Sequence, residues 1–363
     1  MSIQERISDI AVHQGVRHVR PVAPRLARGL VADVYTQIGR EYGAVAPPFG
    51  LHSPAPANLA GGWAIVRETL VAKGLVSREA KEAVAAAVSR TNECPYCEDV
   101  HTTYLHAFVE RELAEAIVDG HTDRAEGSEL RNLASWAMGT RAPGSKVLED
   151  PPFSRAEAPE IVGVAVAYHY LNRMVNVFLT ESPFPARSRR FKGVLKRLLG
   201  PLLGSKLDRS AVPGESLGFL PAVELPQDLG WAASNPAIAG AFARAAATIG
   251  AAGQRALPEE VRALVQESIR AWDGSDPGLS RRWVEDAMHE LPEPFKPAAR
   301  LALLTALSSY QVDETTISDF SLRHPGDDAL IAATAWSSFT AARKVGTWLH
   351  LPAAPVKHNT GVS

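Results

Sequence analysis

Residues 92–101 read Asn92-Glu93-Cys94-Pro95-Tyr96-Cys97-Glu98-Asp99-Val100-His101, and this segment contains both cysteines of the 363-residue chain. Pro95 has a fixed φ and no amide proton, which suits the first position of a helix. We therefore predict that Cys94 is the N-cap of a helix and that Cys97 is its third residue. Cys94, Cys97 and His101 then share one helix face, because they are spaced at i, i+3 and i+7.

The start of a helix offers unpaired amides and partial positive charge, and both stabilise a thiolate. We therefore expect the pKa of Cys94 and Cys97 to fall below about 8.5. The acidic side chains of Glu98 and Asp99 in the same turn work against this effect, although acids at this position also complement the helix dipole.

The preceding segment, from Arg78 to Arg90, is predicted to form a helix that Ser77 caps. It carries Glu82, twelve residues before Cys94. If the two helices pack so that Glu82 meets His101, the carboxylate would orient the imidazole and raise its basicity.

The complete pattern, Glu-x11-Cys-x2-Cys-x3-His, resembles the alkylhydroperoxidase D branch of the carboxymuconolactone decarboxylase superfamily. All four of its positions match, at Glu82, Cys94, Cys97 and His101. The resemblance implies that Cys97 is the peroxidatic cysteine and that Cys94 resolves it. It also implies that Glu82 and His101 form a proton relay. One position departs from the family, since well-studied members carry a histidine where this chain has Tyr96.

This resemblance implies a thiol-dependent alkyl hydroperoxidase, an oxidoreductase that needs no cofactor beyond a redox-active disulfide between Cys94 and Cys97. A hydroperoxide would be the substrate, and an external dithiol, lipoylated or thioredoxin-like, would be the reductant. Family domains bury apolar faces against copies of themselves, so we expect a homo-oligomer, either a dimer or a trimer.

Four other interpretations of the motif remain open at this point. The cysteines could be a buried, inert pair. They could bind zinc together with His101 if Glu82 or His106 supplied a fourth ligand, although no second Cys-x2-Cys occurs. The chain could be a decarboxylase of the same superfamily, which would leave the two cysteines unexplained. It could also be a redox-sensing or assembly protein that does not turn over.

The composition is that of an ordinary globular protein, with 46% hydrophobic and 21% charged residues. A net charge of −2 gives no reason to expect nucleic acid as a partner. Residues 1–12 contain no apolar core of a signal peptide, and no apolar run is long enough to span a membrane. Two cysteines in a Cys-x2-Cys spacing indicate redox chemistry inside the cell, so the expected location is the cytoplasm.

Helical periodicity dominates the chain, and alternating strand patterns are missing, which predicts an all-α fold. The expected helices cover residues 31–42, 59–73, 78–90, 95–109, 112–118, 128–138 and 158–179 in the first half. Residues 298–307 and 329–349 echo the apolar helices of that half. Ser53-Pro54-Ala55-Pro56 and Ser234-Asn235-Pro236 both lead into a helix, at a shift of 181 residues.

We therefore predict an alkylhydroperoxidase D-like fold that is duplicated within one chain. Residues 1–34 would form an N-terminal arm that packs on the body or on another subunit. Residues 35–182 would form the catalytic domain, and residues 231–363 a degenerate copy without cysteines. At a shift of 180 residues, Glu82 meets Arg262 and His101 meets Arg281, so the copy lacks the chemical groups and its role would be structural.

Residues 183–230 form a basic linker that is rich in proline and glycine. Its basic residues lie among apolar ones and include Arg187, Arg189, Arg190, Lys192, Lys196 and Arg197. Such a segment could bind a membrane surface or an acidic partner. The simpler interpretation, which we favour, is a linker whose leucines dock on the body, so no membrane is expected as a partner.

Two further histidines invite a functional interpretation. His52 lies in a loop, where a surface or capping role is the more common one. His169 lies in a long apolar helix, where a hydrogen-bonded core group is more common than a site residue. We assign Trp231, Trp272 and Trp336 to the core.

Overall fold

We describe the fold from a computed structural model, for residue 9 and residues 12–109, 129–180, 182–184, 196, 199–200, 211–349 and 351. Within these residues the regular structure is helical, and extended backbone pairs only in two isolated bridges. One bridge joins Val16 to Leu179, and the other joins Ala72 to Ala211. The prediction of an all-α fold is confirmed for this part of the chain.

The helices form two consecutive sets that meet near residue 230. The first set contains α2 (Gly29–Tyr42), α3 (Pro47–Gly50), α4 (Pro56–Val66), α5 (Arg78–Thr91), α6 (Pro95–Phe108), α8 (Glu129–Gly139) and α9 (Ala158–Phe178). The second set contains α11 (Pro236–Ala256), α12 (Glu259–Ala271), α13 (Arg282–Ala287), α14 (Lys296–Leu307), α15 (Glu314–Arg323) and α16 (Asp327–Trp348). The short helix expected at residues 112–118 lies outside the described residues.

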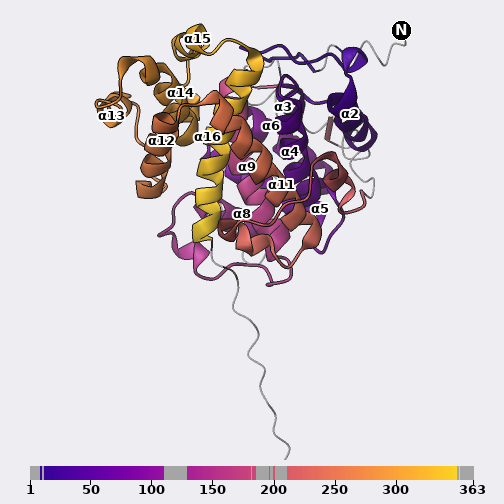
Figure 1. Ribbon diagram of the computed structural model, residues 1–363. Helices are drawn as coiled ribbons and strands as arrows, with labels where there is room; N and C mark the ends of the chain where they lie inside the picture. Colours follow the sequence, from indigo (N-terminus) through magenta and orange to yellow (C-terminus); the bar gives the residue numbers. More distant parts are fainter. Residues whose placement is uncertain are drawn as a thin grey trace, which may run out of the picture.

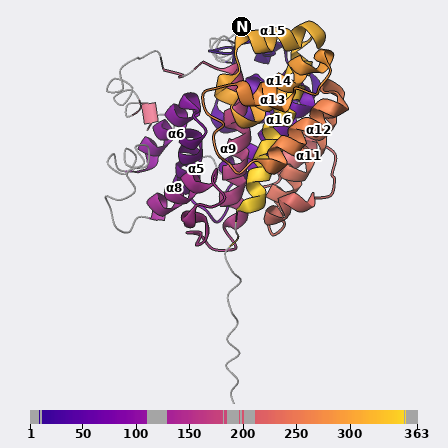
Figure 2. The same cartoon turned by 90° about the vertical axis from the view of Figure 1, so that its left-hand side faces the viewer.

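Helices of the two sets pack against each other in one shared core. α4 lies against α11, α9 lies against α16, and α11 also contacts α16 (Figure 1). Seen from the side, α5, α6 and α8 lie on one flank of α9, and the second set lies on the other (Figure 2). The buried apolar side chains of both sets, including Trp231, Trp272 and Trp336, belong to one continuous cluster.

Helix starts in this chain follow local sequence signals. The side chain of Ser77 accepts a hydrogen bond from the amide of Ala80, as expected for the N-cap of α5. Asn235 caps α11 in the same way, with its side chain accepting from the amide of Ile238. Proline occupies the first turn of both α6 and α11, where its missing amide proton costs no hydrogen bond.

The helix expected over residues 59–73 was placed wrongly at both ends. It begins at Pro56 and ends as an α-helix at Val66, after which η2 (Arg67–Val71) forms one turn of π-helix. Arg67 and Glu68, which open this turn, are both buried and pair with each other across 2.6 Å. Periodicity alone does not reveal such a wide turn, because one extra residue shifts the apolar face without removing it.

The described part of the linker, from residue 211, is fixed to the first set of helices. The guanidinium of Arg67 pairs with Glu41 and also reaches Glu215 at 3.0 Å. The carboxylate of Glu68 accepts hydrogen bonds from the amide of Gly214 and from the hydroxyl of Ser216. Of the basic cluster, Lys196 lies within the described residues, and its ammonium group pairs with Asp99 of α6 at 2.7 Å.

Residues of the predicted N-terminal arm pack on the body of this same chain. The amide of Arg17 donates to the carbonyl of Phe178, and its guanidinium donates to the carbonyl of Leu179. Val12 is completely buried, and the hydroxyl of Tyr35 in α2 donates to the carbonyl of Val22. The arm therefore closes over the end of α9.

The helices that contact each other across the two sets hold matching places in the predicted repeat. α4 and α11 each begin with a proline, Pro56 and Pro236, which are 180 residues apart. α9 and α16 are the long apolar helices of their halves. A fused second copy would pack in this way if it replaced the partner of a symmetric pair. The duplication and the boundaries at residues 34, 182 and 230 remain predictions.

The contact between α11 and α16 depends on a glycine. A Cβ atom at Gly253 would lie 2.2 Å from the ring of Trp336, whereas one at Gly250 would meet nothing within 4 Å. We expect Gly253→Ala to lower the free energy of unfolding by about 1–3 kcal/mol through overpacking. Gly250→Ala in the same helix should raise it by up to about 1 kcal/mol. Urea unfolding measures both changes in free energy. An equal gain in stability for the two variants would contradict the predicted overpacking at Gly253.

None of the helices in the described ranges combines the length and the apolar character that crossing a bilayer requires.

Candidate active site

The two cysteines lie at the start of α6, where the chain turns back from α5. Glu93 adopts a positive φ of 50°, and the amide of Cys94 donates to the carbonyl of Ser89 at 2.9 Å. The carbonyl of Cys94 then accepts the amide of Glu98 at 3.0 Å, which makes Cys94 the N-cap. The predicted local geometry of the motif is confirmed, and both thiols are free.

Glu82 and His101 meet between α5 and α6. The Nδ1 atom of His101 lies 2.6 Å from Oε2 of Glu82, and the Glu82 side chain is completely buried. Arg78, one helical turn before Glu82, donates from Nε to Oε1 of the same carboxylate at 2.8 Å. The carboxylate therefore joins a guanidinium to an imidazole, and it fixes the imidazole with Nε2 free for other contacts.

The charge of Glu82 is maintained by its neighbours. Burial by itself would raise the pKa of this carboxyl, but the guanidinium of Arg78 and the ring of His101 outweigh it and hold the pKa below its usual value. Burial likewise raises the pKa of the nearby Tyr42 hydroxyl. An ionised Glu82 is the state that can stabilise a protonated His101.

A small cavity of about 60 Å³ opens beside Cys97 and His101. Aromatic and aliphatic side chains from α2, α3, α6 and α9 form the rest of its wall, namely Tyr42, Ala46, Pro48, Phe49, Tyr96, Val100, Tyr104, Tyr168 and Leu171. The ring of Tyr168 meets the ring of His101 edge to face, at 4.6 Å between centroids and 88° between planes. The cavity thus offers an apolar surface beside one thiol and one imidazole.

Cys94 lies behind Cys97 and does not line this cavity. Its exposed fraction is 0%, against 3% for Cys97. Burial, followed by the neighbouring sulfur of Cys97, raises the pKa of the Cys94 thiol well above its ordinary value. The expectation of a lowered pKa was therefore wrong for Cys94, because loss of solvent outweighs the partial charge of the helix start.

Polar side chains of α9 support the turn that carries the cysteines. Asn92, two residues before Cys94, contacts His169 and Asn172 through Nδ2 at 3.0 Å each. Asn172 also donates to Ser89 and reaches the thiol of Cys94, where it acts against the rise in that thiol's pKa. His169 has partners at both ring nitrogens, and burial lowers its pKa well below its ordinary value. The prediction of a hydrogen-bonded core histidine is confirmed.

The same turn is tied to the second set of helices. Asn176 donates to the carbonyl of Asn92 and to the hydroxyl of Ser309 at 3.1 Å each. Arg141 donates to the carbonyls of Thr91 and Gly274. The described residues of the second half therefore contribute no group to the cavity, but they help to hold the loop that precedes Cys94.

Sequence reasoning placed Glu82, Cys97 and His101 together correctly but omitted two neighbours. Arg78 stands one turn before Glu82, and this i, i+4 spacing was a signal that could have identified it. Tyr168, whose ring packs against His101, offered no such signal, because no sequence pattern distinguishes it from other aromatic residues of α9.

The zinc interpretation receives no additional ligand from the described residues. In the part of the chain that the structure describes, no group of three or more His, Cys, Asp or Glu side chains could hold a metal ion.

His52 was expected at the surface and is instead buried. Its Nδ1 atom lies 2.9 Å from the carbonyl of Pro48, and its Nε2 atom lies 2.8 Å from the hydroxyl of Tyr170. Burial lowers its pKa to about 4. Only the tertiary structure decides this, because Tyr170, which contacts its ring, comes from α9.

A pH dependence follows from His52. Below about pH 6.5 His52 is protonated in the unfolded chain, whereas in the folded state it stays neutral down to about pH 4. Acid therefore favours unfolding. We expect this histidine to remove up to about 3 kcal/mol of stability across that interval. His52→Gln should flatten the pH profile of unfolding free energy, and His169 should account for slope that remains. The exposed His289 is the control, and equal profiles for His52→Gln and His289→Gln would contradict the prediction.

Comparison with known proteins adds three findings. The model of the carboxymuconolactone decarboxylase family matches residues 57–136, which include the four motif residues. A protein from Mycobacterium tuberculosis named alkyl hydroperoxide reductase is 38% identical over 334 residues, which are 92% of this chain and 95% of that protein. The crystal structure of a Ralstonia eutropha protein, described as an alkylhydroperoxidase AhpD core and uncharacterized peroxidase-related protein, matches with 18% identity and a TM-score of 0.37. That match covers 49% of this chain and 98% of the other.

Proposed function

Because the chain belongs to the superfamily of alkylhydroperoxidase D and carboxymuconolactone decarboxylase, we propose that it is a thiol-dependent peroxidase that reduces small organic hydroperoxides. The observation that carries this proposal is the cavity in which Cys97 and His101 face the same space while Glu82 holds His101 from behind. The name of the Mycobacterium tuberculosis relative agrees with it.

The site residues can carry out a peroxide reduction in successive steps. His101 accepts the thiol proton of Cys97, and Glu82 stabilises the resulting imidazolium. The Cys97 thiolate attacks the distal oxygen of the hydroperoxide, the O–O bond breaks, and the alcohol leaves with the proton from His101. Cys97 is then a sulfenic acid, and attack by the sulfur of Cys94 gives a disulfide and releases water.

The unequal environments of the two thiols support this division of roles. Cys97 lines the cavity, where a peroxide can reach it, and Cys94 is fully enclosed. The high pKa of the Cys94 thiol keeps it protonated in the resting state.

A dithiol must reduce the Cys94–Cys97 disulfide by exchange, and its own oxidation balances the two electrons taken by the peroxide. We propose a lipoylated or thioredoxin-like protein as this donor. The peroxidase itself would need no bound cofactor. It would be a homo-oligomer, either a dimer or a trimer, located in the cytoplasm. The narrow, aromatic cavity favours small alkyl hydroperoxides over long-chain ones.

The proposal is tested by supplying dihydrolipoamide and tert-butyl hydroperoxide to the wild-type protein. We expect one dithiol to be consumed per peroxide over many turnovers. The thiols of Cys94 and Cys97 should be lost when peroxide is added and restored when the dithiol reduces the protein. Oxidation of a single equivalent without turnover, with each of several dithiol donors, would instead indicate a redox sensor. Failure of peroxide to oxidise either cysteine would end the redox proposal.

A further inference from the structure

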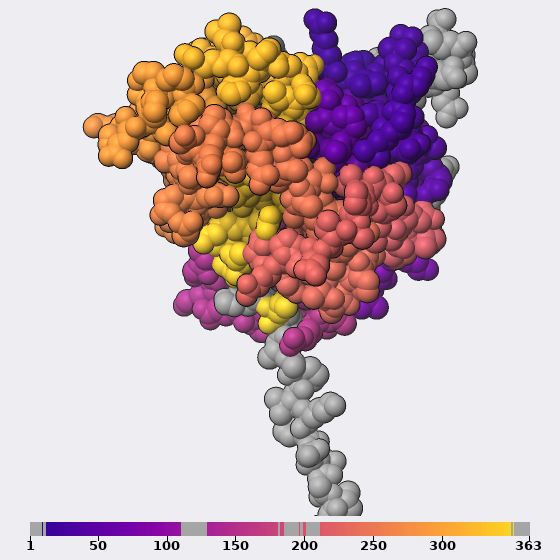
Figure 3. Space-filling model, viewed as in Figure 1, coloured from indigo at the N-terminus to yellow at the C-terminus, as the bar shows by residue number. Residues whose placement is uncertain are grey.

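A second cavity, of about 340 Å³, lies where the two sets of helices meet. Its wall combines the first turns of α4 and α16 with the last turn of α11 and is lined mainly by alanine and proline. Figure 3 shows the N-terminal part of the chain beside the second half on the face turned to the viewer. None of its lining residues belongs to the cavity beside Cys97.

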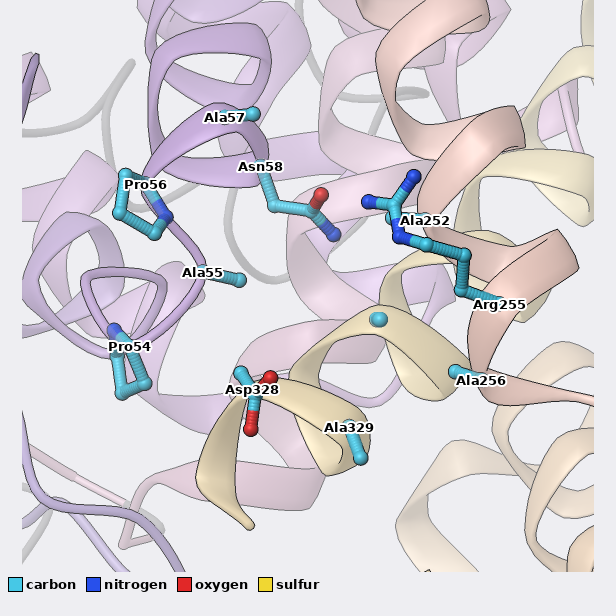
Figure 4. Close-up of a pocket in the computed structure, with 11 residues that line it drawn as sticks. Pro54, Ala55, Pro56, Ala57, Asn58, Ala252, Arg255, Ala256, Asp328 and Ala329 are labelled. Atoms are coloured by element: carbon cyan, nitrogen blue, oxygen red, sulfur yellow. The ribbon is translucent and has the colours of Figure 1, made fainter.

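Asn58 is a buried polar residue in this cavity, and its side-chain nitrogen lacks a partner among the residues that the structure describes. Its exposed fraction is 1%, and its Nδ2 atom has no hydrogen bond. Figure 4 shows its side chain reaching from α4 toward Arg255 on α11, with Asp328 on the opposite side. A buried amide without a partner is costly to the folded state, and a ligand that offers an acceptor would relieve that cost.

Arg255 and Asp328 bring opposite charges to the mouth of the cavity. Both are exposed, and neither forms a hydrogen bond or ion pair with its side chain among the residues that the structure describes. The two groups therefore share one cavity without neutralising each other. A cavity with separate positive and negative groups is complementary to a molecule with two separate charges.

The two helix starts add hydrogen-bond donors to the wall. Ala55 and Gly326, the N-caps of α4 and α16, provide no side-chain cap. Amides in the first turn of each helix therefore have no partner within the helix, and they favour a negatively charged group. The acidic residues of the first turn of α16 offset this preference on the side of Asp328.

From this arrangement we propose that the cavity binds a small zwitterion of the amino-acid class, either a free amino acid or a dipeptide. The carboxylate of the ligand lies toward Arg255 and the amide of Asn58, and its ammonium group lies toward Asp328. The volume suits a molecule of that size, and the alanine and proline walls contact its apolar part. This site is independent of the peroxidase proposal.

The test is calorimetric titration of the full chain with L-alanine and L-alanyl-L-alanine, which distinguishes the two sizes of ligand. N-acetyl-L-alanine and L-alaninamide are matched probes that each keep one charge. We expect one saturable site per chain for at least one zwitterion and binding at least about tenfold weaker for the blocked probes. Arg255→Gln and Asp328→Asn should each weaken binding of the zwitterion by about tenfold. Arg282→Gln, which replaces an exposed arginine outside the cavity, should leave binding unchanged.

Three outcomes would overturn the proposal. The first is no saturable binding of either zwitterion up to about 10 mM, a range that detects affinities near 1 mM. The second is equal binding of N-acetyl-L-alanine, which would indicate a simple anion site. The third is unchanged binding in both cavity variants, which would place the ligand elsewhere. Because both replaced side chains are exposed, neither variant should fail to fold.

Discussion

Replacing Cys97 by serine is expected to lower peroxide-dependent turnover by a factor of roughly 10³ or more, because a hydroxyl is a far weaker nucleophile than a thiolate at neutral pH. The hydroxyl would still fit the cavity, since serine differs from cysteine at one atom and Cys97 is almost fully buried. The fold should therefore be kept, and circular dichroism with thermal unfolding checks this.

Cys94→Ser is the matched control for Cys97→Ser. It keeps the thiol that lines the cavity and removes the one behind it. We expect it to consume one equivalent of peroxide, to accumulate a sulfenic acid that a dimedone label traps, and to form no internal disulfide. Labelling of Cys94 in the Cys97→Ser variant, at the wild-type rate, would show that the roles of the two cysteines are reversed.

The second large effect is expected from Glu82→Gln, which leaves the guanidinium of Arg78 beside a neutral group. The Arg78 side chain is only 15% exposed, so the stranded charge should lower the free energy of unfolding by about 3 kcal/mol. The same change removes the group that orients His101, and it should slow the oxidation of Cys97 by roughly a hundredfold. Chemical denaturation and single-turnover kinetics measure the two effects.

Two further variants separate these effects. Glu79→Gln removes the same charge from the first turn of the same helix and should change stability by less than about 1 kcal/mol. Adding Arg78→Met to Glu82→Gln should recover stability but not the oxidation rate, since it removes the stranded charge without restoring the relay. Equal destabilisation by Glu79→Gln and Glu82→Gln would show that the buried ion pair has no special role.

The pH dependence of wild-type stability provides an independent check on Glu82. Its pKa is held below the usual value, so its contribution is fully present above about pH 4.5 and is lost as the pH falls through the folded-state pKa. The Glu82→Gln variant should lack this part of the acid transition. An unchanged acid transition would mean that the pKa of Glu82 does not change on folding.

Local features of this chain were readable from the sequence. The proline after Cys94, the cap at Ser77 and the 3.6-residue periodicity depend on neighbours along the chain, so they placed α5 and α6 nearly to the residue. The spacing of Cys94, Cys97 and His101 placed them on one face of a helix, and the match to a known motif identified Glu82 as their companion.

The environment of each group was decided only by the tertiary structure. The pKa of Cys94 rises because distant parts of the chain exclude water from it, and His52 is buried because Tyr170 of α9 covers it. Arg78 is a further example, because its guanidinium is buried beside Glu82 and Tyr42 only where α5 meets α6 and α2. The sequence by itself determined which groups are candidates for the chemistry and which helices present them. Burial and long-range contacts, which depend on how the helices pack, decided which thiol faces the cavity and which is enclosed.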